Sequence, residues 1–119
     1  MTEKQLPHQH AHHEIKMTRQ LDQVADFQIV AEVFKQLSDS SRVRIFWLLC
    51  HCEECVMNIS ALVDMSSPAV SHHLRQLKTS GLIVSRREGK EVYYKAADTE
   101  ESHLLHRTIE RIMTINCPQ

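Results

Sequence analysis

The 119-residue sequence has no long apolar run; its longest unbroken one extends only from Ile45 to Cys50. A membrane-spanning helix needs about 20 predominantly apolar residues, so this run is far too short to cross a bilayer. No signal-peptide pattern opens the chain either. These absences predict a cytoplasmic protein with no membrane partner, of a length that suits a single domain.

The sequence also lacks the residue patterns of an enzyme. It contains no Ser/His/Asp triad or paired-carboxylate arrangement, and so short a chain can hardly enclose a substrate pocket. Neither sign of charge dominates, since the formal net charge is -1. The charge is unevenly distributed, however, because residues 66–95 hold six Lys or Arg and only two Glu, a local charge of +4. This asymmetry predicts a DNA-facing side on an otherwise acidic body.

Without a secretion signal, the four cysteines are predicted to be reduced thiols and not disulfides. Three of them fall within the six residues 50–55, and the fourth is Cys117. Cys50 continues an apolar helical stripe, whereas Cys52 and Cys55 lie in a polar stretch where packing gives no reason for a cysteine. Thiolates favour zinc, cadmium, lead, copper(I) or arsenite, so we predict Cys50, Cys52 and Cys55 as metal ligands.

Two other uses of these residues are considered. A redox or persulfide switch would need low-pKa thiols at Cys52 and Cys55, and the neighbouring Glu53 and Glu54 disfavour it by raising thiol pKa values. A metal-buffering protein is the other alternative, and the nine histidines of the chain favour it.

Residues 1–17 have little apolar content and include the histidine-rich stretch 8–13, which predicts a flexible N-terminal arm. His10 and His12 of this arm are candidate metal ligands, from the same subunit or its partner. The folded domain is predicted to extend from residue 18 to 116.

Apolar spacing predicts helices at about 22–37, 41–51, 59–63, 68–80 and 98–115, with 41–51 as the central, most buried one. Asn58, Ser67 and Asp98 are the predicted caps of the last three. Strands are predicted at 82–86 and 91–95, on either side of the turn at Glu88-Gly89. The predicted fold class is mainly α with a β-hairpin wing, the winged helix-turn-helix.

This order of elements suits DNA binding, because the second helix of such a unit enters the major groove and the wing lies over flanking phosphates. The inward residues of helix 68–80 are Val70, Leu74 and Leu77, and His73 is either inward and hydrogen-bonded or outward. The remaining polar side chains can donate to base edges and phosphates. Our candidate DNA-binding residues are Ser67, Ser71, His72, Arg75 and Gln76 on the helix and Arg86, Arg87 and Lys90 on the hairpin.

Several motifs resemble those of the ArsR/SmtB family of bacterial metal-sensing repressors. They are Ser41-Arg42-Val43-Arg44-Ile45, Ser71-His72-His73-Leu74, Gly81-Leu82-Ile83, Arg87-Glu88-Gly89-Lys90 and Tyr93-Tyr94. The resemblance implies a homodimer packed through its first and last helices, which binds operator DNA and releases it when an inducer binds. It also implies a cysteine-x-cysteine metal site before the recognition helix, where Cys55 matches the first position and Met57 replaces the second.

The family's other site lies across the last helices of the dimer, with an Asp-x-His near the start and a His-x-x-His or His-x-x-Glu near the end. This chain offers Asp98, His103, His106 and Glu110 there, although their spacing departs from the family pattern. His103, His106 and Glu110 are therefore further candidate ligands, and Cys117 is a candidate for either site. The predicted function is a metal-responsive repressor that leaves its operator when zinc, cadmium or lead binds cysteine and histidine ligands.

Overall fold

The computed structural model describes residues 7–8 and 14–117. The chain falls into two compact units, divided between Phe34 and Lys35. Within the described ranges, no helix combines the length and apolar character needed to span a bilayer.

The first unit consists of helix α1, Glu14–Leu21, and most of helix α2, Val24–Gln36. Helix α1 begins four residues before the predicted domain boundary, so residues 14–17, assigned to the arm, are helical. Helix α2 agrees with the predicted apolar stripe. Its large apolar residues stay exposed, with Phe27, Val30 and Phe34 44%, 48% and 67% accessible. Among the described residues of the first unit, this face of α2 therefore forms no core.

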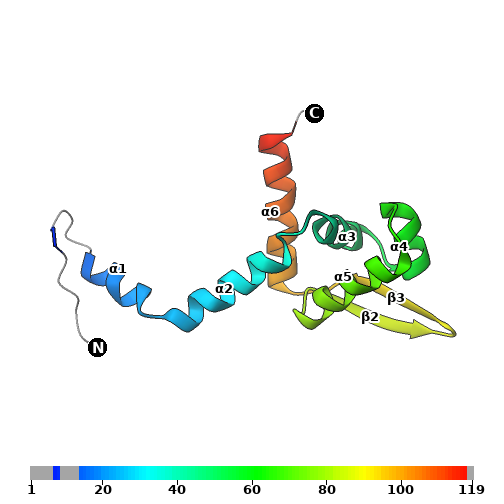
Figure 1. Cartoon of the computed structure of the whole chain (residues 1–119), viewed down its shortest axis with the longest axis horizontal. Helices are drawn as coiled ribbons and strands as arrows, with labels where there is room; N and C mark the ends of the chain where they lie inside the picture. Colours follow the sequence, from blue (N-terminus) through cyan, green and yellow to red (C-terminus); the bar gives the residue numbers. More distant parts are fainter. Residues whose placement is uncertain (1–6, 9–13, 118–119) are drawn as a thin grey trace. The chain divides into compact units, whose positions relative to one another are not determined.

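The second unit is built around helix α3, Ser40–His51, which packs against α4, Val56–Val63, α5, Ser67–Thr79, and α6, Glu100–Asn116. Figure 1 shows α3 among these helices, with the hairpin extending beyond α5. The core residues come from every one of these elements. They are Ile45, Phe46, Leu49, Ile59, Val63, Val70, Leu74, Leu77, Leu82, Ile83, Ala97 and Leu105. Helix α3 is central as predicted, since it contacts α4, α5, α6 and β3. The prediction that it is also the most buried helix is wrong, because α5 buries four residues and α3 buries three.

The helix starts differ from the predicted caps by a few residues. Ser66 and not Ser67 caps α5, accepting a hydrogen bond from the Ala69 N–H at 3.3 Å. Thr99 and not Asp98 caps α6, through the Ser102 N–H. Helix α4 begins at Val56, three residues before the predicted start, and Asn58 lies inside it. Where two adjacent residues both have a hydroxyl or carboxyl side chain, either one can cap the helix. Only the backbone geometry then decides which of the two is the N-cap.

The sheet has one strand more than the sequence predicts. The hairpin strands β2, Ile83–Glu88, and β3, Glu91–Ala96, pair antiparallel, and β1, Glu54–Cys55, adds to the other edge of β3. Gly89 closes the hairpin at φ +62°, a conformation that glycine adopts without steric cost. Since β1 pairs Cys55 with Tyr93, the end of the cysteine segment, residues 50–55, is part of the wing sheet.

Candidate functional site

Helices α4 and α5 and the hairpin form the predicted helix-turn-helix and wing. The chain turns between the helices at Asp64, which takes the left-handed conformation at φ 56°. Helix α5 buries its inward side chains, as predicted. Of the polar candidates on the opposite side, Ser67, His72 and Arg75 are exposed, and Ser71 and Gln76 are half-buried. The geometry leaves this polar face accessible to a ligand.

His73 is a buried structural residue of α5 and not part of the outer face. Its Nδ1 accepts a hydrogen bond from Arg42 Nε at 3.4 Å, and its Nε2 lies 3.9 Å from Asp39 Oδ1. Burial lowers the pKa of His73, and the Asp39 carboxylate opposes that shift only in part. Asp39 itself caps α3, and the hydrogen bond from the Arg42 N–H lowers its carboxyl pKa. The inward, hydrogen-bonded alternative for His73 is thus confirmed.

On the hairpin, Arg87 and Lys90 are exposed and have no ion-pair or hydrogen-bond partner in the described part of the chain. Arg86 differs from them. Its guanidinium donates to Glu53 at 2.7 Å and to Glu88 at 2.6 Å, and it lies 4.9 Å from the Tyr93 ring centre. These two carboxylates raise the Arg86 pKa, and the guanidinium lowers that of Glu53. Arg86 therefore connects the wing to the cysteine segment.

The three clustered cysteines are half-buried free thiols. Cys50 lies in the last turn of α3, where burial and then the Glu110 charge raise its pKa to about 11. The Cys52 thiol donates to the Leu48 carbonyl at 3.5 Å, and burial and Glu54 raise its pKa. A raised pKa favours the thiol over the thiolate at both positions.

A cavity of about 380 Å³ lies between the end of α3 and the start of α6. Its lining includes Cys50, His51 and Cys52 from one side and His103 and His106 from the other. Two of the predicted thiol ligands and two of the predicted histidines therefore belong to residues that line one cavity. Cys55, on β1, is not among its lining residues.

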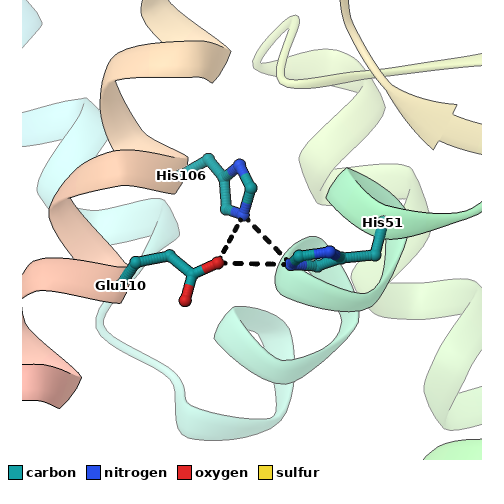
Figure 2. A group of neighbouring side chains, drawn as sticks. All are labelled: His51, His106 and Glu110. Carbon is teal, nitrogen blue, oxygen red and sulfur yellow. Dashed lines mark hydrogen bonds and ion pairs between the residues drawn. The ribbon is translucent and has the colours of Figure 1, made fainter.

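His51, His106 and Glu110 form the tightest group of potential metal ligands. Figure 2 shows the His51 ring at the end of α3 pointing at the two α6 side chains. His106 Nε2 lies 3.1 Å from His51 Nε2 and 3.0 Å from Glu110 Oε1, and the remaining distance, His51 Nε2 to Glu110 Oε1, is 3.4 Å. In the described part of the chain no other three His, Cys, Asp or Glu residues bring ligand atoms so close.

The other predicted ligands are distributed differently. His103 pairs with Asp98 at 2.7 Å and stays outside the group, although all three candidates share one helix. Cys117 is exposed just after α6. His10 and His12 lie outside the described residues. The sequence does not single out His51, because no local pattern signals its contact with His106, 55 residues later in the chain.

Comparison with known proteins identifies relatives of the chain and of its fold. The family model described as bacterial regulatory protein, arsR family, matches residues 39–85. A cadmium resistance transcriptional regulatory protein CadC homolog of Staphylococcus aureus is 42% identical over 79 residues, covering 66% of this chain and 65% of the relative. The CadC protein of Listeria innocua is 41% identical over 85 residues, covering 69% and 71%. The chain thus spans about two thirds of the length of these relatives.

Among solved structures, one similar fold is the homodimeric winged helix-turn-helix DNA-binding domain of a possible ArsR-family regulator from Mycobacterium bovis. It superposes with a TM-score of 0.70 at 26% identity and covers 95% of this chain and 94% of its own. The predicted fold class is confirmed.

Proposed function

The chain belongs to the arsR family of bacterial regulatory proteins, and from that premise we propose that it is a metal-responsive repressor whose thiols between α3 and α4 sense the metal. The observation that carries the proposal is a winged helix-turn-helix unit whose wing sheet includes Cys55, the last of the three clustered cysteines. Like its relatives, which are named as transcriptional regulators, the chain is a regulator and not an enzyme.

DNA is bound by the outer face of α5 together with the hairpin tip. The accessible donors of α5 suit base edges in the major groove, and the unpaired cations Arg87 and Lys90 suit phosphates beside it. Arg86 contributes less directly, since its guanidinium is held by Glu53 and Glu88.

The protein acts as a homodimer, as the similar Mycobacterium bovis domain does, and two-fold symmetry would place two α5 helices on the half-sites of a palindromic operator. Exposed apolar side chains suited to burial against a second copy occur on α2 in the first unit and, separately, on α6 in the second. They include Phe27, Ile29, Val30 and Phe34 on α2 and Leu104, Ile112, Met113 and Ile115 on α6.

The metal is a soft or borderline ion, and cadmium, lead and zinc are the first candidates. The two relatives are cadmium-resistance regulators by name, and thiolates prefer such ions over magnesium or calcium. Cys50, Cys52 and Cys55 are the proposed thiolate ligands, and the structure describes no group of three ligand atoms that includes a sulfur. The ligand set is therefore completed by movement of residues 52–55 or by residues of the N-terminal arm.

Residues 52–55 are placed to transmit that movement to DNA. Cys55 belongs to β1, which pairs with β3 of the wing, and Glu53 holds Arg86 of β2. A shift of this segment toward a metal ion changes both contacts, so it alters how the hairpin approaches the phosphates. Such coupling between two sites is typically about 1–3 kcal/mol, or roughly 5- to 150-fold in affinity.

The test begins by selecting bound duplexes from a random DNA library with the reduced, metal-free protein. Fluorescence anisotropy on the selected duplex then measures affinity with cadmium, lead and zinc in turn. We expect at least one ion to weaken binding by roughly 5-fold or more. Affinity that responds to none of them, nor to copper(I) or arsenite, would overturn the proposal.

The ligand assignment is tested with Cys52→Ser and Cys55→Ser, which keep the size of the side chain but not the thiolate. Each is expected to bind DNA like the wild type and to lose the metal response. Cys117→Ser is the matched control, because that thiol lies beyond α6, and its response is expected to persist.

A further inference from the structure

We infer that His51, His106 and Glu110 form a second metal site, within one subunit and built of nitrogen and oxygen donors, which takes zinc. This site lies between α3 and α6 and goes beyond the thiolate site of the proposed function. Its ligands are the last residue of α3, His51, and two residues of α6, and none of them is a thiol.

The three ligand atoms already have the spacing of a tetrahedral zinc site. Zinc lies about 2.0–2.2 Å from imidazole nitrogens and carboxylate oxygens, so ligand atoms at tetrahedral angles are roughly 3.3–3.5 Å apart. The observed edges of the triangle are 3.0, 3.1 and 3.4 Å. A shift of a few tenths of an ångström would complete the geometry.

Counting protons shows why hydrogen bonds alone do not account for the group. The three atoms are in mutual contact, so full satisfaction needs a hydrogen on each of three edges. Two neutral imidazoles supply at most two Nε2 hydrogens, and an ionised Glu110 supplies none. At least one of the three contacts therefore brings together two N–H donors or two lone pairs and cannot be a hydrogen bond. A cation among the three atoms satisfies all three lone pairs at once.

The donors are held in place by neighbouring structure. His106 and Glu110 are one turn apart on α6 and therefore share a face. Ser102 anchors the start of this helix, since its buried hydroxyl donates to the Leu82 carbonyl at 3.0 Å. The His51 ring lies against Trp47, with ring centres 4.3 Å apart. Preorganised ligands lose little entropy when a metal binds.

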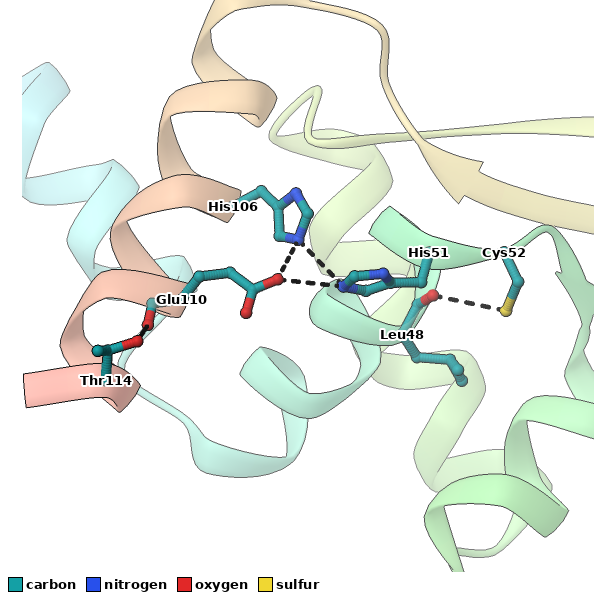
Figure 3. A network of polar contacts seen from close by, with 6 residues as sticks. All are labelled: Leu48, His51, Cys52, His106, Glu110 and Thr114. Carbon is teal, nitrogen blue, oxygen red and sulfur yellow. Dashed lines mark hydrogen bonds and ion pairs between the residues drawn. The ribbon is translucent and has the colours of Figure 1, made fainter. Parts of the chain in front are cut away.

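The donor set and its exposure indicate the kind of ion. Two imidazoles and one carboxylate match a borderline ion such as zinc, whereas thiolates select softer ions. The side chains of His51 and Glu110 are 43% and 47% exposed, so solvent can supply a fourth ligand. Figure 3 shows that the adjacent residue, Cys52, turns the other way toward Leu48. The two sites are therefore neighbours with separate ligands.

The test measures zinc affinity of the reduced full-length protein by competition with a chromophoric zinc indicator. His106→Ala is expected to weaken binding of one zinc equivalent by ~10-fold or more, as loss of a direct ligand should exceed the effect of losing a supporting residue. Glu110→Gln, which keeps the shape of an exposed side chain, should weaken it as well. His103→Ala is the matched control, a histidine of the same helix outside the group, and is expected to bind as the wild type does.

The sole tryptophan provides a second readout, because Trp47 touches His51. Zinc should change its emission in the wild type and in His103→Ala but not in His106→Ala. The site would be overturned if the wild type and the three variants bound zinc with equal affinity. It would also be overturned if His103→Ala and His106→Ala lost equal zinc affinity. If no metal releases DNA while zinc affinity still depends on His106, the proposed function fails and this site stands.

Discussion

At the scale of single residues, His73 occupies a position that makes stability depend on pH. It is 9% exposed, and Arg42 donates to its Nδ1. A proton on that nitrogen would remove the acceptor and bring a second cation beside the guanidinium. This agrees with the lowered pKa of His73, for which burial is the main cause.

The sign of the effect follows from proton counting. Because the folded-state pKa lies below the ordinary value of 6.5, the unfolded chain binds more protons as the pH falls from about 7 toward 5. His73 therefore contributes stability that is present above pH 6.5 and is lost as the pH falls through its folded-state pKa. Asp39, which faces the same imidazole, stays ionised throughout this window because its own pKa is lowered.

We predict that His73→Gln flattens the decline of the unfolding free energy between pH 7 and pH 5. Urea denaturation at several pH values measures it. His103→Gln is the control, since that exposed histidine is not among the groups that shift the His73 pKa, and its profile should keep the wild-type slope. Equal slopes for the wild type and His73→Gln would contradict the prediction.

At the scale of elements, strand β1 joins the sensing segment to the wing. Only two residues long, it pairs through Glu54 and Cys55 with Tyr94 and Tyr93. The preceding residue, Glu53, adds a bidentate ion pair with Arg86 of β2. The ion pair lies at the surface, where such pairs contribute little to the stability of the fold. Its main effect is therefore to hold the hairpin in position next to residue 53.

We predict that Glu53→Gln uncouples the wing from the metal. Arg86 keeps Glu88 as a partner but is no longer held by the cysteine segment. The ratio of DNA affinities without and with cadmium should fall toward unity, while cadmium binding itself is unchanged. Glu91→Gln removes the same charge from β3 and has no such partner, so its ratio should stay as in the wild type. Anisotropy measures the ratios, and an undiminished ratio in Glu53→Gln would refute the coupling.

The accuracy of sequence reasoning also differs between elements. Helices α3 and α5 and the hairpin follow from apolar spacing, because their periodicity extends over many residues. Strand β1 is too short to show a period, and the exact caps depend on which neighbour has the right backbone angles. The His51–His106 contact depends on how α3 and α6 pack, so it has no local signature. The burial of His73 does not follow from the sequence, because spacing alone does not separate a polar core residue from an exposed one.

At the scale of the whole molecule, one chain leaves much apolar surface uncovered. On α6, Leu104, Ile112 and Ile115 are 53%, 52% and 64% exposed, and at 100° per residue they share one side of the helix. Exposed apolar patches of this kind mark interaction surfaces. In the proposed repressor, a second copy of the chain covers them.

We predict that Ile112→Glu converts the dimer into monomers, because burying an unpaired carboxylate in an apolar interface is strongly unfavourable. Light scattering coupled to size-exclusion chromatography measures the mass. Since two linked α5 helices bind one operator with a large avidity, DNA affinity should fall on the order of 100-fold. Thr114→Glu adds the same charge two residues away, on the polar side of α6, and should remain dimeric. If Ile112→Glu stays dimeric with normal DNA affinity, the interface does not include this side of α6. If it is monomeric and keeps full affinity, a single α5 helix and wing suffice for recognition.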